Sequence, residues 1–189
     1  MKTRCSWVGE TPIYQKYHDE EWGVPVHDDR RLFEKIVLEG AQAGLSWITI
    51  LKRRENYRRA FDNFDIDKVA AYSDKDIERL VNDAGIIRNR LKIKSAINNA
   101  RRVQGIQERH GSLDRFLWSF VGGSTIQNKW KSGGNLPVTT PESDAMSKAL
   151  KKAGFTFIGS TTCYAMMQSV GMVNDHTVNC FRHCVLAEC

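Results

Sequence analysis

Residues 37–51, VLEGAQAGLSWITIL, place three groups that could do chemistry inside an apolar run: the carboxylate of Glu39, the amide of Gln42 and the indole of Trp47. Burying an unpaired carboxylate costs several kcal/mol or shifts its pKa. A carboxylate next to aromatic rings is, however, suited to a flat cationic heterocycle. The stretch therefore indicates either a hydrogen-bonded core residue or a pocket for a cationic ring.

Aromatic residues that could line such a pocket are concentrated in the first quarter of the chain: Trp7, Tyr14, Tyr17 and Trp22. Aromatic residues at helical spacing usually belong to a hydrophobic core. Close to a buried carboxylate, the same rings would instead form the walls of a pocket.

A second candidate site is the stretch ERLVNDAGIIRNRLKIKSAI, residues 78–97, which combines a short apolar helix, a tight turn and a basic helix. This is the outline of a helix-hairpin-helix, in which backbone N–H groups hold a DNA phosphate. We expect Gly85, Ile86, Ile87 and Arg88 to lie against that phosphate. An ordinary pair of helices joined by a glycine-containing turn is the alternative.

Two thiols and two imidazoles, one of each from either end of the chain, could form a closed tetrahedral zinc site. These residues are Cys5, His18, His176 and Cys180. His176 and Cys180 would share one face if that stretch were helical. The spacing alone leaves other ligands open: His183, Cys184 and Cys189.

The elements that must position these groups are almost all helical, because apolar residues recur at helical spacing after recognisable caps. FTFIG is one of the few stretches that alternate as a strand does, and residues 122–139 form the one obvious long loop. We predict an all-α fold with helices at about 11–23, 28–40, 46–61, 65–72, 73–82, 89–108, 112–121, 140–154 and 160–170.

Composition allows one well-cored domain of 189 residues and excludes a membrane span, since no apolar run is long enough. The net charge of +6 favours a polyanionic partner. Basic residues gather at 52–59 and again at 88–102, where acids are absent between Asp83 and Glu108. Five cysteines and no signal peptide indicate a reducing compartment, the cytoplasm.

Several longer stretches resemble the bacterial 3-methyladenine DNA glycosylase I family. They are RCSWV, YQKYHDEEWGVP, LFEKIVLEGAQAGLSWITILKRRENYR, DAGIIRNR, FLWSFV, SKALKKAGFTFIG and GMVNDH, and they run from residue 4 to about 180. The combination of YHDEEWG with LEGAQAGLSW is highly specific to that family.

The resemblance implies a helix-hairpin-helix glycosylase that flips 3-methyladenine out of double-stranded DNA and hydrolyses its N-glycosidic bond. It implies one structural Zn²⁺ ion on Cys5, His18, His176 and Cys180, which joins the N- and C-terminal segments. It assigns Glu39 and Tyr17 to the base pocket with Trp47 as stacking platform, and places Trp7, Tyr14 and Trp22 around them. We expect Tyr17 to be the first partner of Glu39 in the empty protein.

The same motifs imply how the duplex is engaged. Gln42 would occupy the gap left by the flipped nucleotide, Leu45 would act as a wedge, and Gly40 and Gly44 would shape the turn between them. We expect a monomeric single unit, residues 1–189, with one lobe at about 45–115 and another formed by 1–44 and 116–189.

One departure from other helix-hairpin-helix glycosylases is informative. The aspartate that commonly follows the hairpin is absent, Asp114 lies further on, and no lysine occupies the Schiff-base position. This favours a monofunctional enzyme that acts on a labile cationic base, without strand cleavage. The alternatives are a DNA-binding module without catalysis and a zinc hydrolase, which would need an open coordination position.

Overall fold

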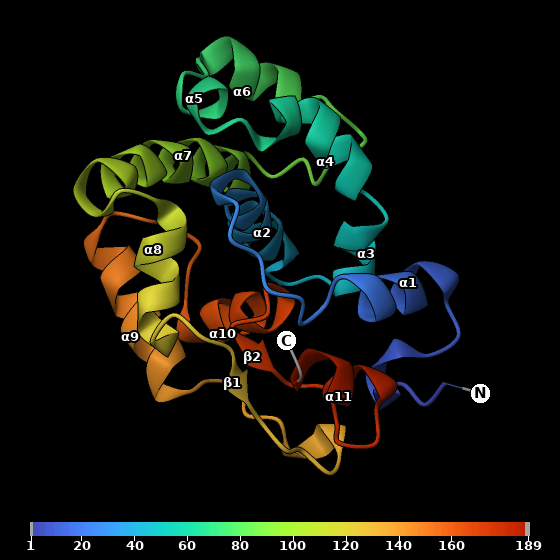
Figure 1. Ribbon diagram of the computed structural model, residues 1–189. Helices are drawn as coiled ribbons and strands as arrows, with labels where there is room; N and C mark the ends of the chain where they lie inside the picture. Colours follow the sequence, from blue (N-terminus) through green and yellow to red (C-terminus); the bar gives the residue numbers. More distant parts are fainter. Residues whose placement is uncertain (1, 188–189) are drawn as a thin grey trace.

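Helices form nearly all of the structure, a computed structural model that describes residues 2–187 (Figure 1). The predicted helical class is therefore confirmed. The helices are α1 (Pro12–Glu20), α2 (Asp29–Gln42), α3 (Trp47–Leu51), α4 (Arg54–Ala60), α5 (Ile66–Ala70), α6 (Asp74–Val81), α7 (Arg90–His110), α8 (Leu113–Trp118), α9 (Pro141–Lys152), α10 (Ser160–Ser169) and α11 (Phe181–Ala187). Single 3₁₀ turns lie at Ser6–Val8, Asp62–Phe64, Ser119–Val121 and Gly133–Asn135.

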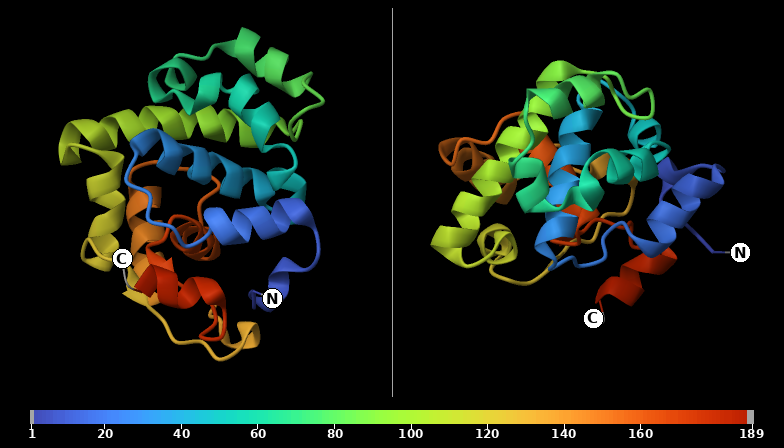
Figure 2. Two further views of the ribbon diagram at one scale, coloured as in Figure 1. Left: turned by 45° about the vertical axis from the view of Figure 1, so that its right-hand side comes forward. Right: turned by 90° about the horizontal axis from the view of Figure 1, so that it is seen from above.

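Helix α2 lies at the centre of the molecule, with α7 crossing it on one side and α10 on the other (Figures 1 and 2). Asp28 caps its first turn by accepting a hydrogen bond from the Arg31 N–H at 2.8 Å. Leu32, Phe33 and Leu38 are fully buried along it. Helices α4 to α6 pack above α7 as a further layer. The site residues near the end of α2 are therefore held by a helix that is packed on several sides.

The predicted single helix at 46–61 is wrong, because the chain turns at Lys52 and Arg53 and separates α3 from α4. Helix α3 contacts both apolar clusters, because Ile50 lies in the large core whereas Leu51 does not. Leu51 packs with Tyr17 and the N-terminal residues, whereas Phe61 packs in the large core. The periodicity of apolar residues alone does not predict where such a helix is interrupted.

The predicted loop at 122–139 carries structure that the sequence did not indicate. Strand β1 (Ile126–Gln127) pairs in parallel with β2 (Val173–Asn174), with Ile126 opposite Val173. Strands of two residues show too little alternation to be recognised. FTFIG, the alternating stretch, forms no strand. The pairing attaches the loop to the segment that carries His176.

The two ends of the chain lie side by side. Phe181, at the start of the unpredicted α11, donates its N–H to the Thr3 carbonyl at 3.0 Å. Residues 23–26, after α1, bond to the end of α10, with Val26 donating to Val170 at 3.1 Å. None of the helices in residues 2–187 has the length and apolarity needed to cross a membrane.

Gly171 makes the contact between these two segments possible, and it supplies a stability prediction. Its φ is +74°, and a Cβ would lie 2.5 Å from the Pro25 nitrogen and the Val24 carbonyl carbon. Gly171→Ala should lower the free energy of unfolding by about 2–5 kcal/mol, from left-handed strain plus overlap with backbone. Urea denaturation measures the change.

Gly122→Ala is the matched control, because Gly122 has a φ of +67° but no atom within 4 Å of an added Cβ. It should cost only the conformational strain of about 1–2 kcal/mol. Equal losses in the two variants would contradict the close packing of Gly171.

Candidate active site and metal centre

A cavity of about 220 Å³ opens where α1, α2, α3 and α10 meet. It brings together all six predicted base-pocket residues, together with Gln42. The complete lining is Trp7, Tyr14, Tyr17, Trp22, Glu39, Gln42, Trp47, Leu136, Ala165 and Gln168. An acidic group surrounded by aromatic rings is suited to a flat, positively charged ligand.

The aromatic walls are held against one another by edge contacts. Trp7 lies 5.1 Å from both Tyr14 and Trp22 between ring centroids, at interplanar angles of 69° and 72°. Tyr17 lies 5.4 Å from Trp47 at 47°. Such contacts add to the burial of each ring, and they fix the walls before a ligand arrives.

Glu39 is 6% exposed. Burial raises the pKa of its carboxyl to about 7, and Lys35 acts in the opposite direction. The expected partner is wrong, since no hydrogen bond joins Tyr17 to Glu39 among the described residues. Tyr17 instead faces the Lys35 ammonium, which lies 4.9 Å from its ring centroid. The charge that compensates Glu39 within the protein therefore comes from its own helix.

Two polar residues of the site were missed by the sequence analysis. Gln168 on α10 lines the cavity, and its amide donates to Asp175 at 2.8 Å. The buried Asp175 carboxylate also accepts bonds from Tyr164 at 2.6 Å and from Trp130 at 2.7 Å. It thereby ties the cavity wall to the segment of His176. No local pattern predicts this, because the donors come from segments distant in sequence.

The turn after α2 splits the run 37–51 into two helices, as predicted, but Gly40 lies inside α2 and only Gly44 belongs to the turn. Gly44 has a φ of +79°, and Leu45 is 40% exposed. Ser46 occupies the N-cap of α3, but its hydroxyl bonds to the Thr49 hydroxyl at 2.8 Å instead of capping the helix. A second hollow of about 200 Å³ runs beside this turn and shares Glu39 with the cavity.

Lys92 of α7 holds the end of α2. Its ammonium donates to the carbonyls of Ala41 at 2.9 Å and Ala43 at 2.6 Å. A cation at these carbonyls satisfies acceptors that a helix end leaves free. The basic helix and the turn at residues 42–46 are thus directly connected.

The predicted phosphate-binding turn, residues 85–88, joins α6 to α7. Three of its four amides are used within the protein: Gly85 donates to Asp83 Oδ1 (2.7 Å), Ile86 to the Asp83 carbonyl (3.4 Å) and Ile87 to Tyr57 Oη (3.1 Å). Arg88 is exposed, and its N–H has no partner among residues 2–187. Arg88 is therefore the member of the turn that can bind an anion without rearrangement.

The two basic groups are partly neutralised by internal contacts. Arg54 donates to Glu21 at 2.8 Å and Arg58 to Glu34 at 3.0 Å, so these two cations of the group at 52–59 are held in ion pairs. Arg90 of α7 is paired with exposed Glu78. Among the described residues, no other cation of residues 88–102 pairs with an acid. Lys92 and Arg101 donate to backbone carbonyls, whereas Arg88, Lys94 and Arg102 have neither kind of partner within residues 2–187.

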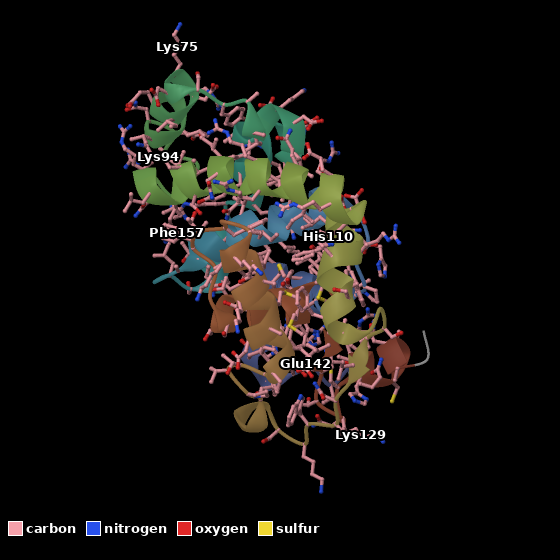
Figure 3. All side chains as sticks on the ribbon, turned by 90° about the vertical axis from the view of Figure 1, so that its left-hand side faces the viewer. Lys75, Lys94, His110, Lys129, Glu142 and Phe157 are labelled. Atoms are coloured by element: carbon pink, nitrogen blue, oxygen red, sulfur yellow. The ribbon has the colours of Figure 1, made fainter. Side chains whose placement is uncertain are left out.

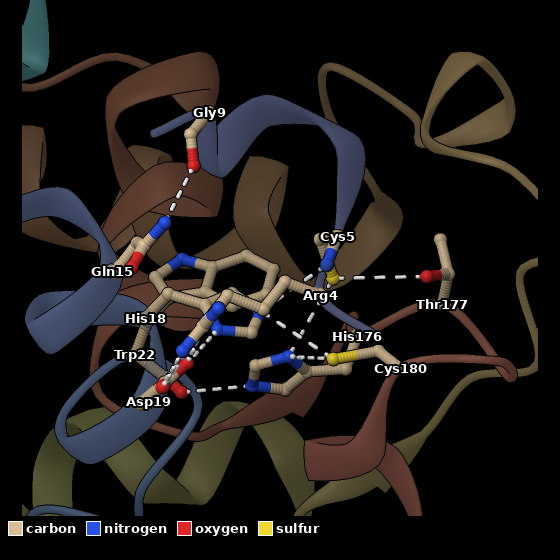
Figure 4. A network of polar contacts seen from close by, with 10 residues as sticks. All are labelled: Arg4, Cys5, Gly9, Gln15, His18, Asp19, Trp22, His176, Thr177 and Cys180. Carbon is tan, nitrogen blue, oxygen red and sulfur yellow. Dashed lines mark hydrogen bonds and ion pairs between the residues drawn. The ribbon is translucent and has the colours of Figure 1, made fainter. Parts of the chain in front are cut away.

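The four predicted metal ligands converge at the junction of the chain ends (Figure 4). All are buried, and their ligand atoms lie within 4.8 Å of one another. The distances are Cys180 Sγ–His18 Nε2 3.4 Å, Cys180 Sγ–His176 Nδ1 3.5 Å and Cys5 Sγ–His176 Nδ1 3.6 Å. A tetrahedral centre with bonds of about 2.0–2.3 Å separates its ligand atoms by about 3.3–3.8 Å. The cluster therefore has the size of a metal site.

The surroundings of the cluster fit metal binding as well. The remaining ring nitrogens contact acceptors, with His18 Nδ1 2.8 Å from Asp19 and His176 Nε2 3.0 Å from the Trp22 carbonyl (Figure 4). Such contacts orient histidine ligands in metal sites. The pKa of the Cys5 thiol is lowered to about 6, chiefly by its hydrogen bond with Cys180.

The alternative ligands left open by the spacing lie elsewhere. His183 Nε2 contacts the Asn128 carbonyl at 2.8 Å, and Cys184 is exposed on α11. Cys189 lies outside the described residues. His176 and Cys180 are brought together by turns between β2 and α11, and the helix considered for that stretch is absent.

Asp114, which follows Glu108 beyond the hairpin, does not line the cavity, and its carboxylate lies 2.7 Å from the His27 ring.

The chain matches known proteins along almost its whole length. The methyladenine glycosylase family profile matches residues 7–183. DNA-3-methyladenine glycosylase 1 of Escherichia coli is 53% identical over 94% of this chain and 95% of its own length. The Haemophilus influenzae DNA-3-methyladenine glycosylase is 50% identical over 95% and 97%.

Solved structures agree with these matches. A crystal structure of 3-methyladenine DNA glycosylase I has a TM-score of 0.93 and 52% identity, covering 96% of this chain and 100% of that one. The Staphylococcus aureus enzyme, described in a study of 3-methyladenine recognition, has a TM-score of 0.92 at 34% identity, over 94% of this chain and 95% of its own. This chain is a member of the methyladenine glycosylase family.

Proposed function

We propose that this protein removes 3-methyladenine from alkylated double-stranded DNA by hydrolysis of the N-glycosidic bond and leaves an abasic site. The observation that carries the proposal is the Glu39 carboxylate, buried in a cavity with walls of tryptophan and tyrosine. The relatives named for this activity support the choice of substrate.

The chemistry follows from the charge of the base. Methylation at N3 makes adenine cationic while it remains attached to the sugar, so its N-glycosidic bond is weak and the leaving base is neutral. Glu39 complements the positive ring and accepts hydrogen bonds from its amino edge, while Trp47 stacks on its face. A neutral adenine gains less from both contacts. Selection of the damaged base therefore supplies much of the catalytic advantage.

The base reaches the cavity by rotation out of the duplex, which is easiest for a poorly paired nucleotide. The hollow beside Gly44 shares Glu39 with the cavity and gives the base a route. Exposed Leu45 enters the stack as a wedge, and Gln42 occupies the vacated position. No lysine acts as a Schiff-base nucleophile, so the enzyme is monofunctional and leaves the strand intact.

The DNA lies across the helix-hairpin-helix of α6 and α7, with a phosphate at Arg88. Lys94 and Phe157 lie on one side of the molecule, along α7 and below it, whereas Lys129 lies at the far end (Figure 3). The lobe at 45–115 would grip the backbone, and the lobe of 1–44 and 116–189 would hold the base. One monomer contains every residue that this arrangement uses.

The metal is a single structural Zn²⁺ ion held by Cys5, His18, His176 and Cys180. Bound there, it cross-links the chain ends and takes no part in the reaction, because four protein ligands leave no open position. His18 follows Tyr17 directly, so the ion also fixes one wall of the cavity.

Substitutions in the cavity test the role of charge and stacking. Glu39→Gln should lower kcat/KM for 3-methyladenine release by roughly 30-fold or more, since a matched negative charge is lost. Trp47→Ala should lower it by about 5- to 150-fold, the value of one stacked base. Release of labelled bases from methylated DNA, separated by identity, measures both.

Glu108→Gln, an exposed acid near the end of α7, is the charge-matched control and should retain full activity. Full activity in both cavity variants would exclude the mechanism. DNA binding without base release by the unmodified protein would indicate a binding module.

Removal of zinc should unfold the junction of the chain ends. Cys5→Ser and Cys180→Ser should each reduce bound zinc from one ion to nearly none and lower Tm by roughly 10 °C or more. Cys184→Ser should change neither quantity, because that thiol is exposed and separate. Elemental analysis and thermal melting measure these effects, and X-ray absorption showing a bound water would instead favour a zinc hydrolase.

The phosphate contact at the hairpin can be tested separately from the cavity. Arg88→Ala should weaken binding to damaged and undamaged duplexes by the same factor and reduce the slope of log Kd against log salt concentration by about one. Lys129→Ala removes the same charge at the far end of the molecule (Figure 3) and should not change the slope. Equal effects of the two variants would contradict this placement.

A further inference from the structure

Lys35 carries a positive charge into the protein interior directly behind the base cavity. It is 7% exposed, and its ammonium nitrogen is buried without a hydrogen-bond partner among the described residues. Lysine almost never occupies such a position without compensation, because desolvation disfavours its charged form. A role in packing alone would be filled better by an apolar side chain.

The Lys35 ammonium lies close to two aromatic rings of the cavity, those of Tyr17 and Trp47. Its nitrogen lies 4.9 Å from the Tyr17 ring centroid and 5.6 Å from that of Trp47. Both rings line the cavity, whereas Lys35 does not. The ammonium is thus separated from a bound base by the rings on which that base would stack.

Two neighbouring ion pairs account for the other charges around Lys35. Glu21, beyond α1, pairs with Arg54 of α4 at 2.8 Å, and Glu34 of α2 pairs with Arg58 of α4 at 2.9 Å. These contacts leave the two acids with hydrogen-bonded cationic partners.

The remaining charges are those of Lys35 and Glu39. They stand four residues apart on one face of α2. Tyr17 contributes a phenol that burial keeps protonated, and α10 contributes Ala165 and Gln168, which do not titrate. The cluster is neutral only while Lys35 and Glu39 are both charged or both uncharged.

We propose that Lys35 is the internal counter-ion of Glu39. The Lys35 ammonium holds the Glu39 carboxylate ionised in the empty cavity, and Lys35 loses its proton when a cationic base replaces it as the charge that balances Glu39. This inference rests on the proposed function. It makes Lys35 a positioning residue, because it acts on the base through Glu39 and the rings. A neutral base leaves the pair unchanged and does not displace the proton.

Burial acts on the two groups in the direction that this exchange needs. It lowers the pKa of Lys35 and raises that of Glu39, so both approach neutral pH. Arrival of a second cation beside Glu39 further disfavours the charged form of Lys35. Lys35 then releases its proton to solvent, which restores the neutrality of the cluster.

The direct test is a titration of the Glu39 carboxyl carbon by ¹³C NMR in the full-length zinc-containing protein. Lys35→Met, of similar length and apolar, should raise the midpoint by about one pH unit or more, because an opposing cation within reach is lost. Lys35→Arg retains the charge and should leave the midpoint near that of the unmodified protein. Lys148→Met, on the exposed face of α9, controls for net charge.

Activity supplies the second readout. At a pH below the Glu39 midpoints of both proteins, Lys35→Met should lower kcat/KM for 3-methyladenine release by about tenfold. A midpoint raised by about one pH unit lowers the ionised fraction of Glu39 by that factor. Above both midpoints the variant should equal or exceed the unmodified enzyme, and in a Glu39→Gln background the pH-dependent effect should vanish. If Lys35 had a purely structural role, its replacement would lower kcat/KM by the same factor at every pH.

An unchanged Glu39 midpoint in Lys35→Met, or a parallel pH profile, would overturn the inference. The proposed function fails differently, if the unmodified protein releases no 3-methyladenine. The NMR titration does not depend on that activity, so it decides the role of Lys35 in either case.

Discussion

The burial of one carboxylate, Glu39, is the constraint on which the rest of the structure depends. A charge in a desolvated position must be balanced, and the elements around the end of α2 do so with rings from α1 and α3 and with Lys35 on the same helix. The cavity consequently complements the positive charge of a ligand as well as its shape. A ligand that lacks positive charge finds a site that is already neutral, which is the physical basis of the discrimination proposed for this enzyme.

The cavity walls come from both ends of the sequence, so their geometry depends on a region that does no chemistry. Trp7 and Tyr14 lie near the N-terminus, whereas Gln168 is supplied by α10. Asp175 and the Cys/His cluster, all of them buried residues, tie these segments together. In the proposed zinc form, loss of the ion would therefore disturb base selection as well as stability.

Much of this arrangement could be predicted from the sequence, because helix periodicity, caps and unusual residue types are local signals. Glu39 and Trp47 were identifiable as exceptions in an apolar run. Residue type gave a larger set of candidate metal ligands, and only the family resemblance reduced it to Cys5, His18, His176 and Cys180. Lys35 was missed because a lysine one helical turn before a glutamate is typical of a solvated surface pair. Asp175 was missed since its partners are defined only by tertiary structure. The partnership expected between Tyr17 and Glu39 was wrong for the same reason.

Lys92 has a consequence for how the protein would follow a duplex. Its bonds to Ala41 and Ala43 couple the helix that begins after Arg88 to the turn that carries Leu45. In the proposed mode of DNA binding, these two hydrogen bonds would hold the phosphate contact at Arg88 and the wedge Leu45 at a constant distance. The protein would then examine one nucleotide at each position on the duplex and would move along the DNA as one rigid body. The position of the bound phosphate would consequently determine which base Leu45 probes, without a separate conformational change.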